Sequence, residues 1–230
     1  TLDATNLGAN VTTAVGNVEF GGAVTVDKGS ATAIGTGSGA GNVTFGSTLG
    51  LSAGTADDLT ITAGTGIVTF AGTVAMDAND LIVASSQNSV VTTGIGGSSG
   101  ALDVTDTGTT DVNGAIAMSG AGTVTLDAAT VGADITTVGG NITFGGAVTG
   151  DKGSATAIGT GGGAAGKVDF KSTLGLTDSL SITAGSGDID LDAAVTLSAN
   201  DLTVVSAGTV TVGSTIGGSG DLAVTSTLTD

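Results

Sequence analysis

The sequence is defined first by the residue types that it lacks. Its 230 residues contain no Cys, Pro, Trp, Tyr, His or Arg, and a single glutamate, Glu19. Without cysteine there is no disulfide scaffold. Without histidine, cysteine or arginine, most acid–base and nucleophilic mechanisms lack the groups that they use. We therefore expect a protein that is not an enzyme and that carries no cofactor and no metal ion.

Positive charge is also scarce. Four lysines stand against 21 acidic residues, which gives a net charge of −17. Nucleic acids and anionic membranes both require a basic surface on the protein that binds them, so we expect neither as a partner. No apolar run approaches the roughly 18 residues of a membrane-spanning helix, so we expect no membrane insertion.

The residues that are present favour strands and turns. Val, Ile, Leu, Ala, Thr and Ser fill most of the chain, and 43 glycines are spread through it. β-Branched residues favour strands, and glycine favours the turns between them. The mean hydropathy of +0.46 is too high for a disordered acidic chain. The composition therefore predicts an all-β fold.

The chain repeats itself over a long distance. Residues 17–37 and 141–161 are identical at 18 of 21 positions, with a shift of 124 residues. Likewise, "LTITAG" at 59–64 returns as "LSITAG" at 180–185. Such repeats indicate an architecture of stacked units. We divide the chain at this repeat into residues 1–124 and residues 125–230, the second copy being incomplete at its end.

A shorter period runs inside each copy. Three phrases, "VEF", "VTF" and "VTF", end in phenylalanine, each 25 residues after the last, and similar phrases in the second copy end 21 to 26 residues apart. The apolar residues in each phrase are two apart, which is the spacing of one face of a strand. We predict that the last residues of these phrases stack in one core column: Phe20, Phe45, Phe70, Phe144, Phe170, Leu191 and Val212.

A short period with glycine-rich corners is typical of a parallel β-solenoid. Successive coils then stack about 4.8 Å apart and pair like residues with like. We predict one continuous solenoid of roughly ten coils, each of about 20–25 residues. Two tandem β-sandwich domains are the alternative, but they explain the long period and not the short one. Between Val112 and Val131 one interval shortens, so the columns cannot be phased there, and we expect a trimmed corner or a distorted coil.

Several glycine-rich stretches could be either nucleotide-binding loops or simple corners between strands. "GTGSGA" at 35–40 and "GTGGGA" at 159–164 satisfy the nucleotide-binding pattern GxGxxA. That site needs a helix directly after the glycines, and here strand and turn residues follow, so we interpret both as corners. Asp27–Lys28 and Asp151–Lys152 each precede a glycine, which suits a turn in which the glycine has a positive φ.

One group of acidic residues could bind a cation. Asp188, Asp190 and Asp192 alternate with Ile189 and Leu191, so the three carboxylates share the outer face of a strand. Several oxygens together suit Ca²⁺. The corresponding stretch of the first copy has none of these acids, and we favour a solvated acidic face.

A second pair of acidic residues could be catalytic. Asp57 and Asp58 are adjacent in the sequence. Neighbouring residues of an extended chain point in opposite directions, so these carboxylates would not converge on one bond. We interpret the pair as part of a polar loop.

Several longer phrases resemble a known class of proteins. "GNVTFGSTLGL", "LTITAGTGIVTFAGTVAM" and "LTVVSAGTVTVGSTIGGSGDL" are similar to the repeat regions of very large bacterial exoproteins, the filamentous-haemagglutinin-like and autotransporter-type adhesins. The resemblance covers nearly the whole chain. It implies a right-handed parallel β-helix, export across a Gram-negative outer membrane, and a place outside the cell or on the bacterial surface. No functional residue carries over, because those repeats have no fixed catalytic set.

We therefore expect a structural stalk or fibre segment of an adhesin-like protein. The alternatives are a self-assembling subunit of an extracellular filament or matrix, and a carbohydrate-binding β-helix. The expected partner is the continuing native chain or further copies of this chain, with host or environmental glycans or proteins as other candidates. Because an open coil presents unpaired backbone groups, we expect concentration-dependent head-to-tail oligomers of the 230-residue chain.

Overall fold

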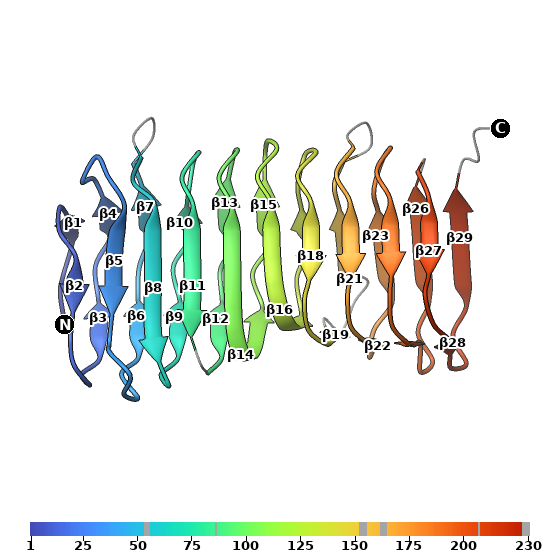
Figure 1. Ribbon diagram of the computed structural model, residues 1–230, viewed down its shortest axis with the longest axis horizontal. Coiled ribbons are helices and arrows are strands. Elements are labelled where there is room, and N and C mark those ends of the chain that lie inside the picture. The colour runs from blue at the N-terminus through green and yellow to red at the C-terminus, as the bar shows by residue number, and fades with distance from the viewer. Residues whose placement is uncertain (53–55, 86, 152–155, 162–164, 207, 227–230) are drawn as a thin grey trace.

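The computed structural model describes residues 1–52, 56–85, 87–151, 156–161, 165–206 and 208–226. All regular structure in these residues is β-strand, and every strand pairing is parallel. The strands wind into a solenoid of about ten coils that follow one another in chain order from the N-terminal to the C-terminal end of an elongated body (Figure 1). The predicted β-solenoid is confirmed.

The coils have three faces, which we number in the order in which the chain visits them. Face 1 is a sheet of 11 strands. Its members are β1 (Thr5–Leu7), β4 (Val24–Val26), β7 (Leu49–Leu51), β10 (Val74–Ala75), β13 (Ile95–Gly97), β15 (Ile116–Met118), β17 (Ile135–Thr136), β20 (Thr156–Gly159), β23 (Leu180–Thr183), β26 (Leu202–Ser206) and β29 (Leu222–Ser226).

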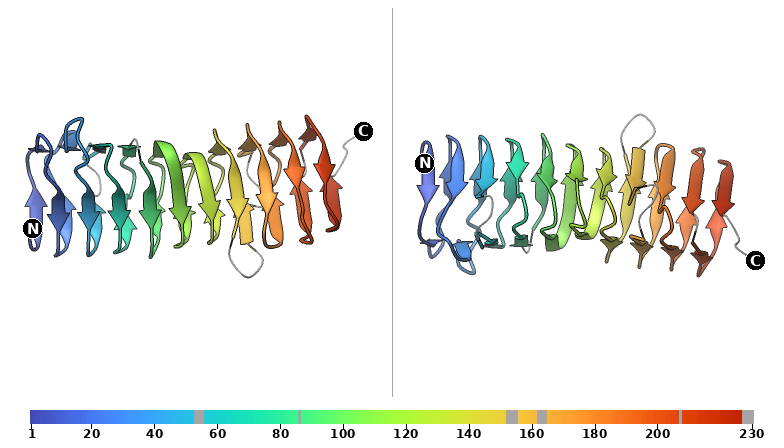
Figure 2. Two further views of the ribbon diagram at one scale, coloured as in Figure 1. Left: turned by 90° about the horizontal axis from the view of Figure 1, so that it is seen from below. Right: turned by 90° about the horizontal axis from the view of Figure 1, so that it is seen from above.

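The other two faces are joined where β14 and β16 cross the corner between them. Face 2 consists of β2 (Val11–Thr12), β5 (Thr32–Gly35), β8 (Leu59–Gly64), β11 (Leu81–Ser85), the first parts of β14 (Leu102–Val112) and β16 (Val124–Val131), β18 (Ile142–Phe144), β21 (Val168–Phe170), β24 (Ile189–Leu191) and β27 (Val210–Val212). Face 3 consists of β3 (Val18–Phe20), β6 (Val43–Phe45), β9 (Val68–Phe70), β12 (Ser89–Val91), the second parts of β14 and β16, β19 (Val148–Gly150), β22 (Leu174–Leu176), β25 (Val195–Thr196) and β28 (Ile216–Gly217). Figure 2 shows these rows of strands from two opposite sides.

The core lies inside the coils and follows the alternation of the strands. In β6, Val43 and Phe45 are buried, while Thr44 between them is only partly covered. The core is a continuous cluster of such inward Val, Ile, Leu, Ala, Met and Phe side chains. A narrow coil has room for one inward layer from each face, which explains why small and β-branched residues dominate the sequence.

The stretch that could not be phased from the sequence contains a trimmed corner. Val104 pairs with Leu126, but Thr109 pairs with Ala128, so four residues on β14 face a single residue on β16. The later coil thus turns from face 2 to face 3 almost without a loop. The expected trimmed corner is confirmed, and it explains the shortened interval in the sequence.

The phenylalanines form two columns, which corrects the prediction of one. On face 3, the rings of Phe20 and Phe45 stack at 5.0 Å between centroids, and those of Phe45 and Phe70 at 5.4 Å. On face 2, Phe144 stacks on Phe170 at 4.7 Å. From Phe70 the column of face 3 continues as Val91, Val112, Val131 and Gly150. The column of Phe144 begins at Val11 and runs through Ile34, Ile61, Val83, Val104 and Leu126.

The last member of the predicted column is not a core residue here. Val212 pairs with Leu191, so its register is as predicted for the second copy. Its side chain is nevertheless 42% exposed, compared with 1% for Leu191. Among the described residues no further strand stacks on β27, so nothing covers Val212 from that side.

The cause of the two columns is that the long repeat is not a whole number of coils. Residues 18–20 lie on face 3, but their counterparts 142–144 lie on face 2. Residues 32–35 lie on face 2, and their counterparts 156–159 lie on face 1. The repeat is one face short of six coils. The boundary between residues 1–124 and 125–230 falls inside β16, so the long repeats are not separate structural units.

Side chains at the corners continue the hydrogen bonding between coils. The Oδ1 atom of Asn17 accepts the N–H of Asn42, and that of Asn42 accepts the N–H of Ile67, both at 2.9 Å. These residues lie at the corner between faces 2 and 3. Their counterpart Asn141 accepts the N–H of Lys167 at 2.9 Å, but at the corner between faces 1 and 2. An asparagine side chain can therefore link successive coils at either corner.

Candidate functional site

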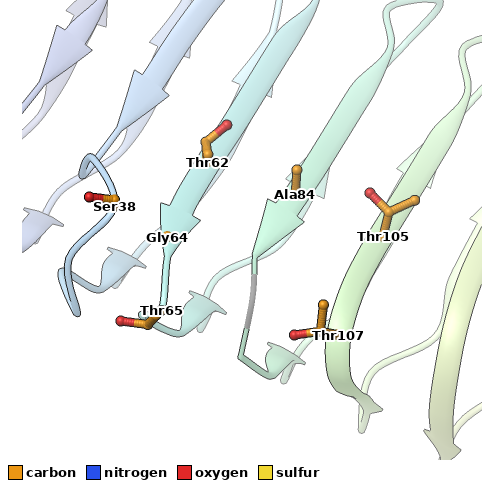
Figure 3. A pocket seen from close by; sticks show the side chains of 7 residues that line it. All are labelled: Ser38, Thr62, Gly64, Thr65, Ala84, Thr105 and Thr107. Carbon is orange, nitrogen blue, oxygen red and sulfur yellow. The ribbon is translucent and has the colours of Figure 1, made fainter.

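A shallow hollow lies on the outer surface of face 2, where the corner to face 3 begins (Figure 3). Its volume is about 400 Å³, and it is lined by Ser38, Thr62, Gly64, Thr65, Ala84, Thr105 and Thr107. The corner after β5 runs from residue 36 to residue 42, whereas the corner after β8 runs only from 65 to 67. The first corner therefore projects beyond the next coil, and Ser38 on it forms one wall.

The chemistry of this hollow is limited to hydroxyls and backbone groups. None of its lining residues is charged or aromatic. Gly64 has a φ of +54°, and a Cβ there would lie 2.4 Å from the carbonyl oxygen of Gly37, so only glycine fits that position. The hollow can offer hydrogen bonds to a neutral ligand, but its lining residues include no carboxylate, imidazole or amine side chain that could act as a general base.

A second candidate site is a cluster of carboxylates further along face 2. One oxygen atom from each of Asp169, Asp190 and Asp192 lies within 4.8 Å of the others. Asp169 and Asp190 occupy the same outward position on β21 and β24, and the register pairs them directly. The Nζ atom of Lys167 lies 2.6 Å from Asp190 Oδ2 and 3.4 Å from Asp169 Oδ2.

The cluster is partly removed from solvent. Asp169 is only 9% exposed, and its Oδ1 atom is buried without a hydrogen-bond partner. The side chain of Lys167 is 37% exposed, and Asp192 lies at the surface. The hydrogen bond to Asp190 raises the pKa of Lys167, with a further contribution from Asp169, so the ammonium group is firmly protonated. Asp169 and Asp190 are therefore paired with a lysine, whereas Asp192 stays exposed to solvent.

The predicted acidic trio is only partly brought together. Ile189 and Leu191 point inward, as predicted, and Asp190 and Asp192 belong to the cluster. Asp188 does not: its Oδ1 atom accepts the N–H of Thr209 on the next coil at 2.7 Å.

Sequence reasoning missed the two groups that join this cluster from the preceding coil. These are Asp169 and Lys167. The signal was present, because "VDF" ending at Phe170 and "IDL" ending at Leu191 place an aspartate at the same position.

The adjacent acids Asp57 and Asp58 contact different coils. Asp57 is fully buried, and its Oδ1 atom accepts the backbone N–H groups of Lys28 at 2.9 Å and Gly29 at 2.6 Å on the preceding coil. Asp58 Oδ1 accepts the N–H of Asp80 on the following coil at 2.9 Å. Both carboxylates, which lie in the corner before β8, accept backbone N–H groups, in agreement with the predicted loop.

The glycine-rich motifs lie at corners as far as they are described. Gly29 after Asp27–Lys28 has a φ of +70°, which fits the predicted turn. The stretch 35–40 begins at the last residue of β5 and continues into the corner before β6, and it contains no helix. Residues 152–155 and 162–164, which hold parts of the second-copy motifs, lie outside the described residues.

Comparison with protein families, with curated proteins and with solved structures finds no match to this chain. Among the described residues no helix is long and apolar enough to cross a membrane.

Proposed function

We propose that this chain is a structural segment, a stalk or fibre, of an extracellular or bacterial surface protein of the adhesin type, without enzymatic activity. The observation that carries this proposal is the continuity of the backbone pairing, in which successive strands of all three faces pair with the coils on either side. At about 4.8 Å per coil the described part is a rod of roughly 50 Å.

The acidic residues support a structural role because many of them hold the backbone. Asp58, Asp80, Asp188 and Asp201 each accept a backbone N–H from the following coil, at distances of 2.7 to 3.0 Å. An acid that accepts such a bond is orienting a corner and is poorly placed for chemistry on a substrate. The remaining acids keep like-charged rods apart in solution.

A self-assembling filament is the second candidate, favoured by the surfaces of the two terminal coils. Among the described residues, three exposed large apolar side chains, those of Val212, Leu222 and Val224, lie on the last strands of faces 1 and 2, and Leu2 is exposed near the opposite end. The strands β1 and β29 each have one backbone edge that no described strand pairs with. A second copy stacked end to end would cover both features.

Electron microscopy of the native material, together with sedimentation of the 230-residue chain, tests these roles. A cell-anchored fibre supports the stalk. Free filaments, with oligomers that grow with concentration, support the self-assembling subunit. A short monomeric particle that binds strongly to a glycan array contradicts both and favours a carbohydrate-binding β-helix.

A further inference from the structure

We propose that the carboxylates of Asp169, Asp190 and Asp192 form a binding site for a calcium ion, and that Lys167 is an internal cation which calcium displaces. This inference does not rest on the proposed stalk function. It concerns one position on face 2, where β21 and β24 lie side by side.

The first reason is the arrangement of oxygen atoms. Three carboxylates offer ligand atoms within 4.8 Å of one another, and together with water they can supply the six to eight oxygens that Ca²⁺ takes. Calcium tolerates irregular geometry, whereas Mg²⁺ requires a near-ideal octahedron and gives up its water reluctantly. An open site with carboxylates from two neighbouring coils therefore fits calcium better.

The second reason is independent of the clustering and concerns Asp169 alone. This residue is 9% exposed, and its Oδ1 atom is buried without a hydrogen-bond partner. A buried carboxylate oxygen in that state calls for a ligand, because losing water without a replacement is unfavourable. Lys167 contacts only Oδ2 of this carboxylate, at 3.4 Å, so it does not provide a partner for Oδ1.

The third reason is the balance of charge. Three carboxylates and one ammonium group leave the cluster with an excess of negative charge, so Lys167 alone does not neutralise it. Lys167 can leave, since its side chain is 37% exposed and extends from the corner before β21. Asp192 lies at the surface and gives an ion direct access.

The chain offers a comparison that shares the buried carboxylate oxygen but lacks the third carboxylate. Asp103 also has a buried Oδ1 atom without a partner, and burial, followed by the nearby charge of Asp127, raises the pKa of Asp103. Only two carboxylates meet there, and among the described residues no third one joins them. This pair therefore serves as a control for general effects of acidic charge on face 2.

The test is isothermal titration calorimetry of the folded 230-residue chain with CaCl₂, and separately with MgCl₂, at constant ionic strength. We expect one saturable calcium site with a dissociation constant of about 10⁻⁴–10⁻³ M, the range of extracellular modules, and weaker binding of magnesium. Asp190→Asn and Asp192→Asn should each weaken calcium binding by about tenfold or more, while Asp127→Asn should leave it unchanged. Asp192 is at the surface, so its substitution tests the site even if the Asp190 variant folds poorly.

Lysine variants test the displacement. Lys167→Gln and Lys28→Gln remove the same charge, but Lys167 makes ion pairs with the cluster. Lys28 lies near the N-terminal end of the solenoid, where its Nζ atom donates to Asn10 and to the carbonyl oxygen of Ala31. Lys167→Gln should tighten calcium binding by about tenfold, and Lys28→Gln should change it by less than threefold, because the distant charge of Lys28 is screened. Hydrogen exchange should slow in β21 and β24 when calcium is added, and not in β3 and β6.

Several results would overturn the proposal. Titration without saturation, or equal weakening by Asp127→Asn and Asp190→Asn, means that calcium only joins the diffuse ion atmosphere of an acidic rod. Equal tightening by the two lysine variants removes Lys167 as the competing cation. Hydrogen exchange that calcium slows throughout the solenoid would show that the ion does not bind at one site on face 2.

Discussion

Replacing Phe45 by alanine should be one of the most damaging single changes in this chain. Its ring is 1% exposed and lies between Phe20 at 5.0 Å and Phe70 at 5.4 Å. Truncation of a buried phenylalanine costs about 3–5 kcal/mol, because it removes buried surface and leaves a cavity. Two ring contacts, each contributing about 0.5–1.5 kcal/mol beyond burial, place this position at the upper end of that range.

The measurement is urea unfolding followed by circular dichroism, with Thr44→Ala as the matched control. Thr44 is the neighbouring residue on the same strand and points outward, so its substitution should change the free energy of unfolding by less than about 0.5 kcal/mol. Phe45→Leu should lose less than Phe45→Ala because it keeps most of the volume. Equal effects at positions 44 and 45 would refute the inward and outward assignment.

A double-mutant cycle tests the two separate columns. Phe45 and Phe70 touch, so alanine substitutions there should be coupled by about 0.5–1.5 kcal/mol. Phe70 and Phe144 lie on different faces, and their effects should add within about 0.5 kcal/mol. Strong coupling between Phe70 and Phe144 would restore the single column and contradict the described register.

Three further predictions concern the corners and the charge. Asn42→Ala removes the acceptor of the Ile67 N–H and should destabilise the fold by about 0.5–1.5 kcal/mol in urea unfolding, whereas exposed Asn6→Ala should have little effect. Burial, and then Asp127, raise the pKa of Asp103, so its ionisation opposes folding; stability from this group is lost as the pH rises from below 3.8 through the higher folded-state pKa. Asp103→Asn should therefore stabilise the chain at pH 7 and have no effect near pH 3, and equal effects at both would refute this. With a net charge of −17, side-by-side association should increase with salt or near pH 4, and light scattering that is strongest in salt-free neutral buffer would contradict it.

The architecture could be read from the sequence because like residues stack on like. A parallel solenoid repeats each inward position once per coil, so the spacing of Phe20, Phe45 and Phe70 directly gives the coil length. The alternation of Val43 and Phe45 gives the inward face by the same logic. These signals are local to one or two coils, and the structure bears them out.

The face on which each phrase lies could not be read from the sequence. All three faces bury the same kinds of residue: Val24 on face 1, Val18 on face 3 and Val168 on face 2 are all inward. A phrase such as "VTF" or "ITF" therefore fits any face equally well. The face on which a phrase lies is decided only by the number of residues in each intervening corner. Corner lengths are weakly encoded in glycine-rich stretches.

Only half of the carboxylate cluster could be predicted from the sequence, for a related reason. Asp190 and Asp192 were expected outside from alternation within one strand. Asp169 joins them through the register between two strands, which depends on the coil being 21 residues long at that point. Lys167 lies in a corner, where alternation gives no direction for the side chain. Contacts between coils can be predicted only when the strand register is known, and the register depends on the length of every preceding corner.

The offset of the long repeat bears on what the chain can do. The hollow beside Thr62, Ala84 and Thr105 lies on face 2, and its counterparts in the second copy, Thr183, Val205 and Thr225, line up on face 1. Two copies of one sequence feature therefore face in different directions around the rod. A flat partner could not meet both at once, so selection for binding such a partner would have favoured a repeat of whole coils. A stalk has no such requirement, because stacking strength and length are the same whichever face a phrase occupies. The rotation of the repeat thus supports the proposed stalk, which requires continuous stacking along the axis and no common face for the two copies.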